Sequence, residues 1–199
     1  MKNNQTGRSM VEMLGVLAII GVLSAGGLAG YSKAMFKHKL NSTMEQITML
    51  VTNIRTHFGT QKNYAALSET NLINLGVVPA VMGNTSGNLK NPFKGSVTIA
   101  KAQARNGVDN SGFTVQYSGL PKEACIALAT ADFGSGAGSG FVGVDVGTSS
   151  TVYIGTGNQV GTSGQEGFTA ATRKEGQPYT MAAAITACSE PATVIWKFY

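Results

Sequence analysis

Few side chains in this sequence carry chemistry of their own, and the two cysteines come first. Cys125 and Cys188 lie 63 positions apart, which is too far for a CxxC redox motif, and no neighbouring ligands complete a zinc site. In an oxidising compartment such a pair forms a disulfide, whereas in a reducing one both would remain free thiols. The pair therefore predicts a covalent link or two packed thiols, and no metal centre.

The two histidines do not form a catalytic arrangement. His38 and His57 lie 19 positions apart, which corresponds to about 30 Å on one straight helix. The sequence contains no Gly-x-Ser-x-Gly elbow, His-Glu-x-x-His pair or P-loop. Asp132 and Asp145 lie near glycines, but their spacing does not fit an EF-hand calcium loop. We therefore expect no catalytic residue, no metal and no cofactor.

Residues 133–178 are rich in Gly, Ser and Thr, and include a Gly136-x-Gly138 pattern. A dinucleotide-binding loop would need a preceding strand and a following helix with an acidic residue, and the sequence predicts neither. We expect a flexible Gly-rich lobe, with candidate short strands at 142–146 and 151–154. The net charge of +5 is scattered along the chain, so we do not expect nucleic acid as a direct ligand.

Glu12 is the carboxylate with the most unusual surroundings. Residues 13–32 contain no charged side chain, and about twenty helical residues span about 30 Å, the thickness of a bilayer's hydrocarbon core. An ionisable group at the head of such a segment is costly and needs a partner or a task. The segment therefore predicts a membrane-embedded helix over about residues 10–31.

Three interpretations of this N-terminal segment are open. The first is a cleaved secretory signal and the second a plain signal anchor, since Lys2 and Arg8 precede the apolar run. The third is a segment processed as in a known protein family that this N-terminus resembles. Three lysines follow the run closely, and a simple count of basic residues would place the C-terminal part in the cytoplasm. These lysines are Lys33, Lys37 and Lys39.

The helix is predicted to continue beyond the apolar run, to residue 58. One apolar stripe at spacings of three and four is typical of an amphipathic helix. It comprises Phe36, Leu40, Met44, Ile47, Val51, Ile54 and Phe58, and Lys37, Asn41, Gln46 and Asn53 are expected on the opposite face. Residues 10–58 would form one helix of about 75 Å, ended by Gly59. The alternative is two shorter helices separated at Gly26-Gly27, since glycine costs about 1 kcal/mol in a helix.

The remaining sequence predicts a mixed domain of short helices and strands. A short helix is capped by Ser68 and Gly76, and a turn-rich segment at 105–112 joins two alternating runs into an antiparallel hairpin. Pro121 begins a helix at its first position. In chain order the later elements are strands 96–100 and 113–117, helices 122–132 and 179–187, and an apolar closing strand at 192–198 that is expected in the middle of a sheet.

The spacing of Gly7 and Glu12 ahead of an apolar helix resembles the processing site of type IV pilins and related pseudopilins. This resemblance implies cleavage between Gly7 and Arg8 by a prepilin peptidase, and methylation of the new N-terminal residue, Arg8. The family usually has an apolar residue at the position of Arg8. It also implies that Glu12 pairs with the free amino group of a neighbouring subunit and fixes the register between identical helices.

Two further motifs are similar to those of type IVb pilins, the toxin-coregulated-pilus kind. They are Lys90-Asn91-Pro92-Phe93 and Leu120-Pro121-Lys122-Glu123-Ala124-Cys125, followed by a second cysteine close to the C-terminus. The resemblance implies an α+β pilin fold, in which a long N-terminal helix packs on a mainly antiparallel β-sheet. It implies an oxidising compartment, and therefore a Cys125–Cys188 disulfide.

The organisation implied is a leader at 1–7, a helix at 8–58 and a globular head at 59–199. The resemblance implies a structural filament subunit rather than an enzyme, held in the inner membrane with its head in the periplasm until it is polymerised into a surface pilus. Its partners would be copies of itself, the prepilin peptidase and the assembly machinery. A minor pilin, a type II secretion pseudopilin and a signal-anchored binding or enzymatic domain remain alternatives. The sequence does not specify whether the fibre serves adhesion, aggregation or conjugation.

Overall fold

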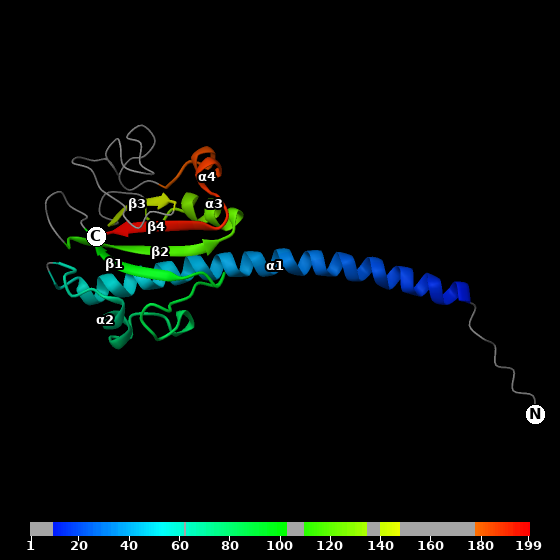
Figure 1. The fold of residues 1–199 in the computed structure, drawn as a ribbon, viewed down its shortest axis with the longest axis horizontal. Helices are drawn as coiled ribbons and strands as arrows, with labels where there is room; N and C mark the ends of the chain where they lie inside the picture. The colour runs from blue at the N-terminus through cyan, green and yellow to red at the C-terminus, as the bar shows by residue number, and fades with distance from the viewer. Residues whose placement is uncertain (1–9, 62, 103–109, 135–139, 148–177) are drawn as a thin grey trace, which may run out of the picture. The chain divides into compact units, whose positions relative to one another are not determined.

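The computed structural model describes residues 10–61, 63–102, 110–134, 140–147 and 178–199. The chain divides into two compact units, Met1–Lys39 and Leu40–Tyr199. Figure 1 shows the helices and strands of the described residues. We call the second unit the head.

Helix α1 runs without interruption from Met10 to Phe58 and supplies residues to both units. The helix continues through Gly26 and Gly27, so the alternative of two separate helices is wrong. It ends before Gly59, where a β-carbon would lie 2.6 Å from the carbonyl oxygen of Arg55. A side chain at residue 59 would thus collide with the last turn, which explains a glycine at this helix end.

In the first unit, α1 carries the apolar segment of residues 10–31 with its side chains exposed. Leu17 and Ile19 are each 63% exposed, and Val22 is 74% exposed. Among the described residues, α1 is the one helix long and apolar enough to cross a membrane. An exposed apolar surface of this size requires lipid or other protein to cover it.

The head contains one four-stranded antiparallel sheet with strand order β1-β2-β4-β3. The strands are β1 (Val97–Ala102), β2 (Gly112–Leu120), β3 (Phe141–Val146) and β4 (Ala192–Phe198). The predicted hairpin is confirmed as the β1–β2 pair, and β4 lies between β2 and β3, as its apolar density predicted. The α+β fold class is therefore confirmed.

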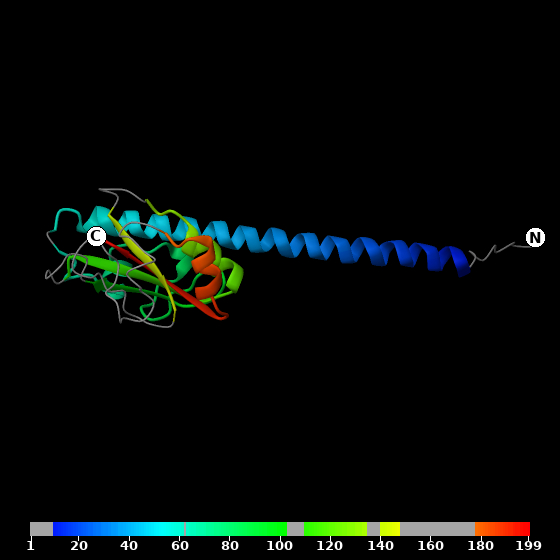
Figure 2. The same ribbon diagram turned by 90° about the horizontal axis from the view of Figure 1, so that it is seen from above.

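The part of α1 within the head lies along one face of the sheet (Figures 1 and 2). Its buried side chains pack against alternate residues of the strands, which include Val115 of β2 and Trp196 of β4. The buried apolar residues of α1 are Ile47, Leu50, Val51, Ile54 and Phe58. Aromatic pairs join across the core with ring centroids between 5.1 and 5.6 Å apart; they link Phe58, Tyr64, Phe113, Phe198 and Phe141.

The expected polar face of α1 is partly wrong. Gln46, which was expected on that face, is only 7% exposed, and Thr43, for which the sequence made no prediction, is fully buried. Both lie one turn before a buried apolar residue, Leu50 or Ile47, so the helix turns them toward the core. Asn53 is part-buried and donates a hydrogen bond of 3.0 Å to the carbonyl oxygen of Val77.

Three short helices surround the sheet: α2 (Glu69–Asn74), α3 (Lys122–Thr130) and α4 (Met181–Ala187). Ser68 caps α2, accepting a hydrogen bond from the Asn71 N–H, and Gly76 adopts a left-handed conformation just after the helix. Pro121 is the N-cap of α3 rather than its first residue. A 3-10 turn, η1 (Ala80–Met82), follows α2, and α3 contacts α4, β3 and β4.

Candidate functional site

Glu12 lies in the first turn of α1 and is exposed within the first unit. The predicted processing residues Gly7 and Arg8 lie outside the described residues. The neighbours of Glu12 along the helix are apolar, and Val11 and Met13 are 75% and 51% exposed. The structure therefore presents one carboxylate at the end of an uncovered apolar helix.

The two cysteines form a disulfide that joins α3 to α4. The sulfur atoms of Cys125 and Cys188 are 2.02 Å apart and their α-carbons 5.9 Å apart. Both residues are buried. The Tyr179 N–H, just before α4, also donates a hydrogen bond of 3.0 Å to the carbonyl oxygen of Ala129 in α3. The C-terminal part of the head is thus fastened covalently and by backbone pairing, and the loop that the disulfide closes contains the predicted Gly-rich lobe, most of which lies outside the described residues.

Asn91, in the Lys90-Asn91-Pro92-Phe93 motif, holds the turn before β1 through its side-chain hydrogen bonds. Its side-chain oxygen accepts hydrogen bonds from the backbone N–H groups of Phe93, at 2.9 Å, and Gly95, at 3.0 Å. Its amide nitrogen donates to the carbonyl oxygen of Ser118 at 2.8 Å. The residue is 4% exposed, so these three bonds satisfy a buried amide that joins the turn before β1 to strand β2.

The two aspartates near glycines have structural partners. The Asp132 carboxylate accepts a hydrogen bond of 2.9 Å from the Gly134 N–H. Asp145 is 2% exposed and accepts hydrogen bonds from the Tyr179 hydroxyl at 3.0 Å and from the Val146 N–H at 2.8 Å. Within the described ranges no group of three or more His, Cys, Asp and Glu side chains could hold a metal ion.

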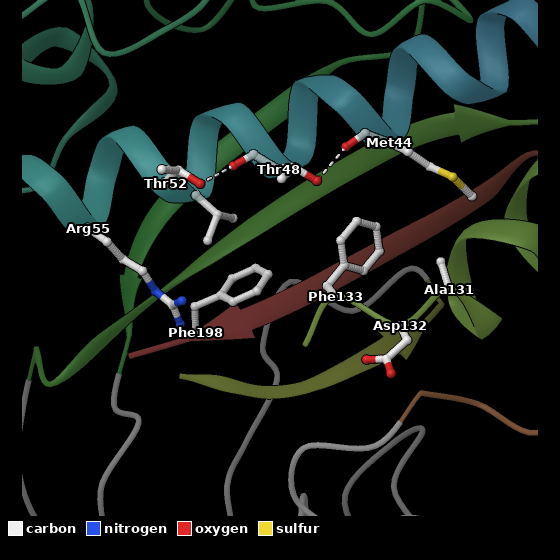
Figure 3. A pocket seen from close by; sticks show the side chains of 9 residues that line it. Met44, Thr48, Thr52, Arg55, Ala131, Asp132, Phe133 and Phe198 are labelled. Carbon is white, nitrogen blue, oxygen red and sulfur yellow. Dashed lines mark hydrogen bonds between the residues drawn. The ribbon is translucent and has the colours of Figure 1, made fainter. Parts of the chain in front are cut away.

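An open cavity of about 400 Å³ lies between α1, β4 and the segment after α3 (Figure 3). Phe133 and Phe198 form part of its apolar wall, and the Arg55 guanidinium carbon lies 5.5 Å from the centroid of the Phe198 ring. Burial lowers the pKa of Arg55, and the nearby Tyr64 and Tyr199 partly oppose this effect. Arginine nevertheless stays protonated in proteins.

The two threonine hydroxyl groups that line this cavity donate hydrogen bonds to backbone carbonyl oxygens of α1. Thr48 donates to the carbonyl oxygen of Met44 at 2.9 Å, and Thr52 donates to that of Thr48 at 2.7 Å. A hydroxyl nucleophile needs an adjacent general base, and the histidines do not supply one here. His38 belongs to the first unit, and His57, which is exposed near the end of α1, does not line the cavity. Within the described lining, the threonine hydroxyls therefore donate to the helix backbone, and no histidine lies beside them.

Sequence reasoning missed Glu69, which protects the edge of the sheet. Its carboxylate accepts hydrogen bonds from the N–H groups of Gly87 at 2.7 Å and Ile99 at 3.2 Å. The Val97 N–H on the same edge strand donates to the carbonyl oxygen of Leu89 at 2.9 Å. These contacts cover part of the outer edge of β1 and oppose unintended strand pairing. Nothing in the spacing of Glu69 along the chain indicated this role.

The sequence profile of the PilS N-terminal family matches residues 37–198. The chain belongs to this family of pilins. The match covers the head and the adjoining part of α1, and it begins after the apolar segment. The assignment of this pilin therefore rests on its head, independently of the Gly7–Glu12 spacing.

Named relatives and solved structures agree with this assignment. The major structural subunit of the bundle-forming pilus of Escherichia coli O127:H6 is 27% identical over 137 residues, which cover 68% of this chain and 69% of the relative. The toxin coregulated pilin of Vibrio cholerae serotype O1 is 26% identical over 137 residues, which cover 65% of this chain and 58% of the relative.

The fold is shared with two type IV pilins of known structure. The type IVb pilin from Salmonella typhi matches with a TM-score of 0.51 and 17% identity, over 78% of this chain and 97% of that one. TcpA, a type IV pilin from the El Tor biotype of Vibrio cholerae, matches with a TM-score of 0.50 and 18% identity, over 81% of this chain and 99% of that one. The resemblance to type IVb pilins is confirmed.

Proposed function

We propose that this pilin is the structural subunit of a type IVb surface filament, which passes through a membrane-held stage before it polymerises. One observation carries the proposal. Helix α1 continues from an apolar segment with uncovered side chains into a head that has the type IVb pilin fold. Lipid covers such a segment before assembly. Copies of the same helix replace the lipid afterward.

In the membrane-held stage, residues 10–31 span the inner membrane with the head in the periplasm. The disulfide supports this orientation, because disulfides persist in oxidising compartments such as the periplasm and are rare in the cytosol. The lysines that follow the apolar run favour the opposite orientation by simple counting. We give the disulfide more weight, since it joins residues deep in the head.

Processing precedes assembly in this proposal. A prepilin peptidase cleaves between Gly7 and Arg8, and Arg8 becomes the methylated N-terminal residue. Its freed amino group is the partner of Glu12 on a neighbouring copy. This ion pair selects one axial register among apolar helices whose surfaces specify register poorly. The assembly machinery then moves the processed subunit from the membrane into the fibre.

The intact mass of the protein in sheared surface material and in membranes tests the proposal, with and without reduction. We expect a chain that starts at Arg8, one methyl group heavier than the unmodified chain and two hydrogens lighter before reduction than after it. A chain that still begins at Met1 or Lys2, found in membranes alone, would instead indicate a plain anchored domain.

The same samples separate the remaining pilin alternatives. A major subunit dominates the sheared fibres, whereas a minor pilin is a small fraction of them. A secretion pseudopilin stays in the cell envelope and is absent from shed fibres. The fold and the relatives favour the pilus subunit, and relative abundance in the fibre decides between its major and minor forms.

A further inference from the structure

The basic residues just beyond the apolar segment have no role in the function proposed so far. Lys33 and Lys37 are exposed in the first unit and lie one helical turn apart, on the same side of α1. The one carboxylate in residues 1–44 is Glu12, and the next is Glu45. Glu12 is about 30 Å from Lys33 along the helix axis, and Glu45 is about 12 Å beyond Lys37. At physiological salt the screening length is about 8 Å, so neither carboxylate along α1 neutralises these lysines.

The position of the two lysines matches the headgroup layer of a bilayer. The uncharged residues 13–32 span the hydrocarbon core of about 30 Å. Beyond the core, each polar headgroup region adds about 5–8 Å. Measured along the helix axis from Ser32, where that core ends, Lys33 lies about 1.5 Å and Lys37 about 7.5 Å further on. Tyr31 is 64% exposed, and tyrosine is enriched at this interface.

We infer that Lys33 and Lys37 form a binding surface for acidic phospholipid headgroups on the periplasmic side of the membrane. This inference rests on the proposed membrane-held stage. Each ammonium group supplies three hydrogen-bond donors to phosphate oxygens, and each lysine close to an anionic membrane surface is attracted to it. Lys39 is half-buried and has another interaction within the structure, so the surface does not depend on it. The bound lipid holds the subunit at a fixed depth until it is extracted.

Spin-labelled lipids test the inference with the full chain in vesicles. The motionally restricted fraction gives the association constant for spin-labelled phosphatidylglycerol relative to spin-labelled phosphatidylcholine of the same chain length. We expect K33Q/K37Q to reduce this ratio about threefold to tenfold at low salt, and K33R/K37R to retain it. Adding 0.5 M NaCl is expected to abolish most of the preference of the unsubstituted chain.

The matched control is K90Q/K122Q, which removes the same charge from two exposed lysines of the head. It is expected to leave the ratio unchanged. A fall of less than about twofold in K33Q/K37Q, or an equal fall in the control, would overturn the inference. Its failure is distinct from failure of the proposed function: fibres that form from processed subunits without a lipid preference overturn this inference alone, and a lipid preference without fibres overturns the proposed function.

Discussion

Individual side chains in this pilin act through pairings that span long stretches of sequence. Glu12 is expected to find its cation on another copy, whereas Asn91 and Asp145 find their partners within the same head. We propose that the first pairing controls assembly, and we expect the others to control stability. Substitutions at these positions therefore have separable consequences.

Glu12→Ala removes the carboxylate that we propose sets the register between helices. We expect fewer fibres per cell and normal amounts of processed subunit in the membrane, because the proposed cleavage precedes the proposed pairing. Counting fibres by electron microscopy, alongside immunoblots of membranes, measures both. Ser24→Ala, another polar substitution within the apolar segment, is the control and leaves fibre number unchanged. Normal numbers of fibres with Glu12→Ala would remove the register role.

Asn91→Ala removes three hydrogen bonds and leaves buried backbone groups of the turn before β1 unsatisfied. We expect the free energy of unfolding of the head to fall by about 2–4 kcal/mol. Denaturant unfolding followed by the fluorescence of the single Trp196 measures this loss. The exposed Asn84→Ala is a suitable control. A loss below about 1 kcal/mol would mean that water replaces these bonds.

We expect the buried Lys197 to make the free energy of unfolding of the head depend on pH. Burial lowers the pKa of its ammonium group to about 8, from the usual 10.5 of a lysine in water. Between these two values the unfolded chain binds more protons than the folded one, so stability rises as the pH increases from about 8. We expect a gain on the order of 1–2 kcal/mol between pH 7.5 and 9.5, measured by urea unfolding. In Lys197→Met this gain should disappear; an unchanged pH profile would mean that another group causes it.

The elements of the head divide into a sheet covered by α1 and a C-terminal pair of helices fastened by the disulfide. Lys197 follows Trp196 on β4, so it points away from the α1 face. The two short helices α3 and α4 bury mainly small residues, such as Ala124 and Ala184. Little apolar area per residue is available there, so a covalent link contributes more than it would in the centre of the sheet.

Replacing both cysteines, as Cys125→Ser with Cys188→Ser, is expected to destabilise the head by about 4 kcal/mol, as the chain-entropy model gives for a loop of this length. We expect faster cleavage by added protease and fewer fibres. Limited proteolysis followed by mass spectrometry shows whether the first cuts fall between α3 and α4. Each single substitution should behave like the double one, since either breaks the link. Unchanged protease resistance and normal fibre numbers would contradict this role.

At the scale of the whole molecule, the chain consists of two units with opposite requirements. The first unit exposes its apolar side chains and needs lipid or other copies around it. The head buries its apolar side chains in a core of its own. A subunit built in this way can exchange one environment for another at its N-terminal helix and keep the head folded throughout.

Ile54→Ala tests this independence in the full chain. Ile54 is fully buried in the head, and its truncation should cost about 2–5 kcal/mol. In detergent micelles, hydrogen exchange should accelerate across the sheet and remain unchanged in residues 10–31. Val22→Ala, at a 74% exposed position, should leave the head unaffected. Equal acceleration in both units would show that they unfold together.

Local patterns carried most of the information on the elements. The stripe of apolar residues predicted the long helix, alternation predicted the β1–β2 hairpin, and apolar density placed β4 inside the sheet. These features depend on neighbours along the chain. The prediction from local periodicity was wrong at Gln46, which was expected on the polar face of α1. The buried side of α1 is wider than its stripe of apolar residues and includes this polar side chain.

The sequence by itself determined the fold class, the membrane-length apolar helix and the family resemblance, since each follows from local periodicity and short motifs. The predicted processing at Gly7 and Arg8 stays a prediction. Only the tertiary structure decided the roles of Asn91, Glu69 and Lys197, whose partners or burial depend on strands and turns far away in sequence. A buried polar group must find its partner in space, and spacing along the chain does not record where folding places that partner.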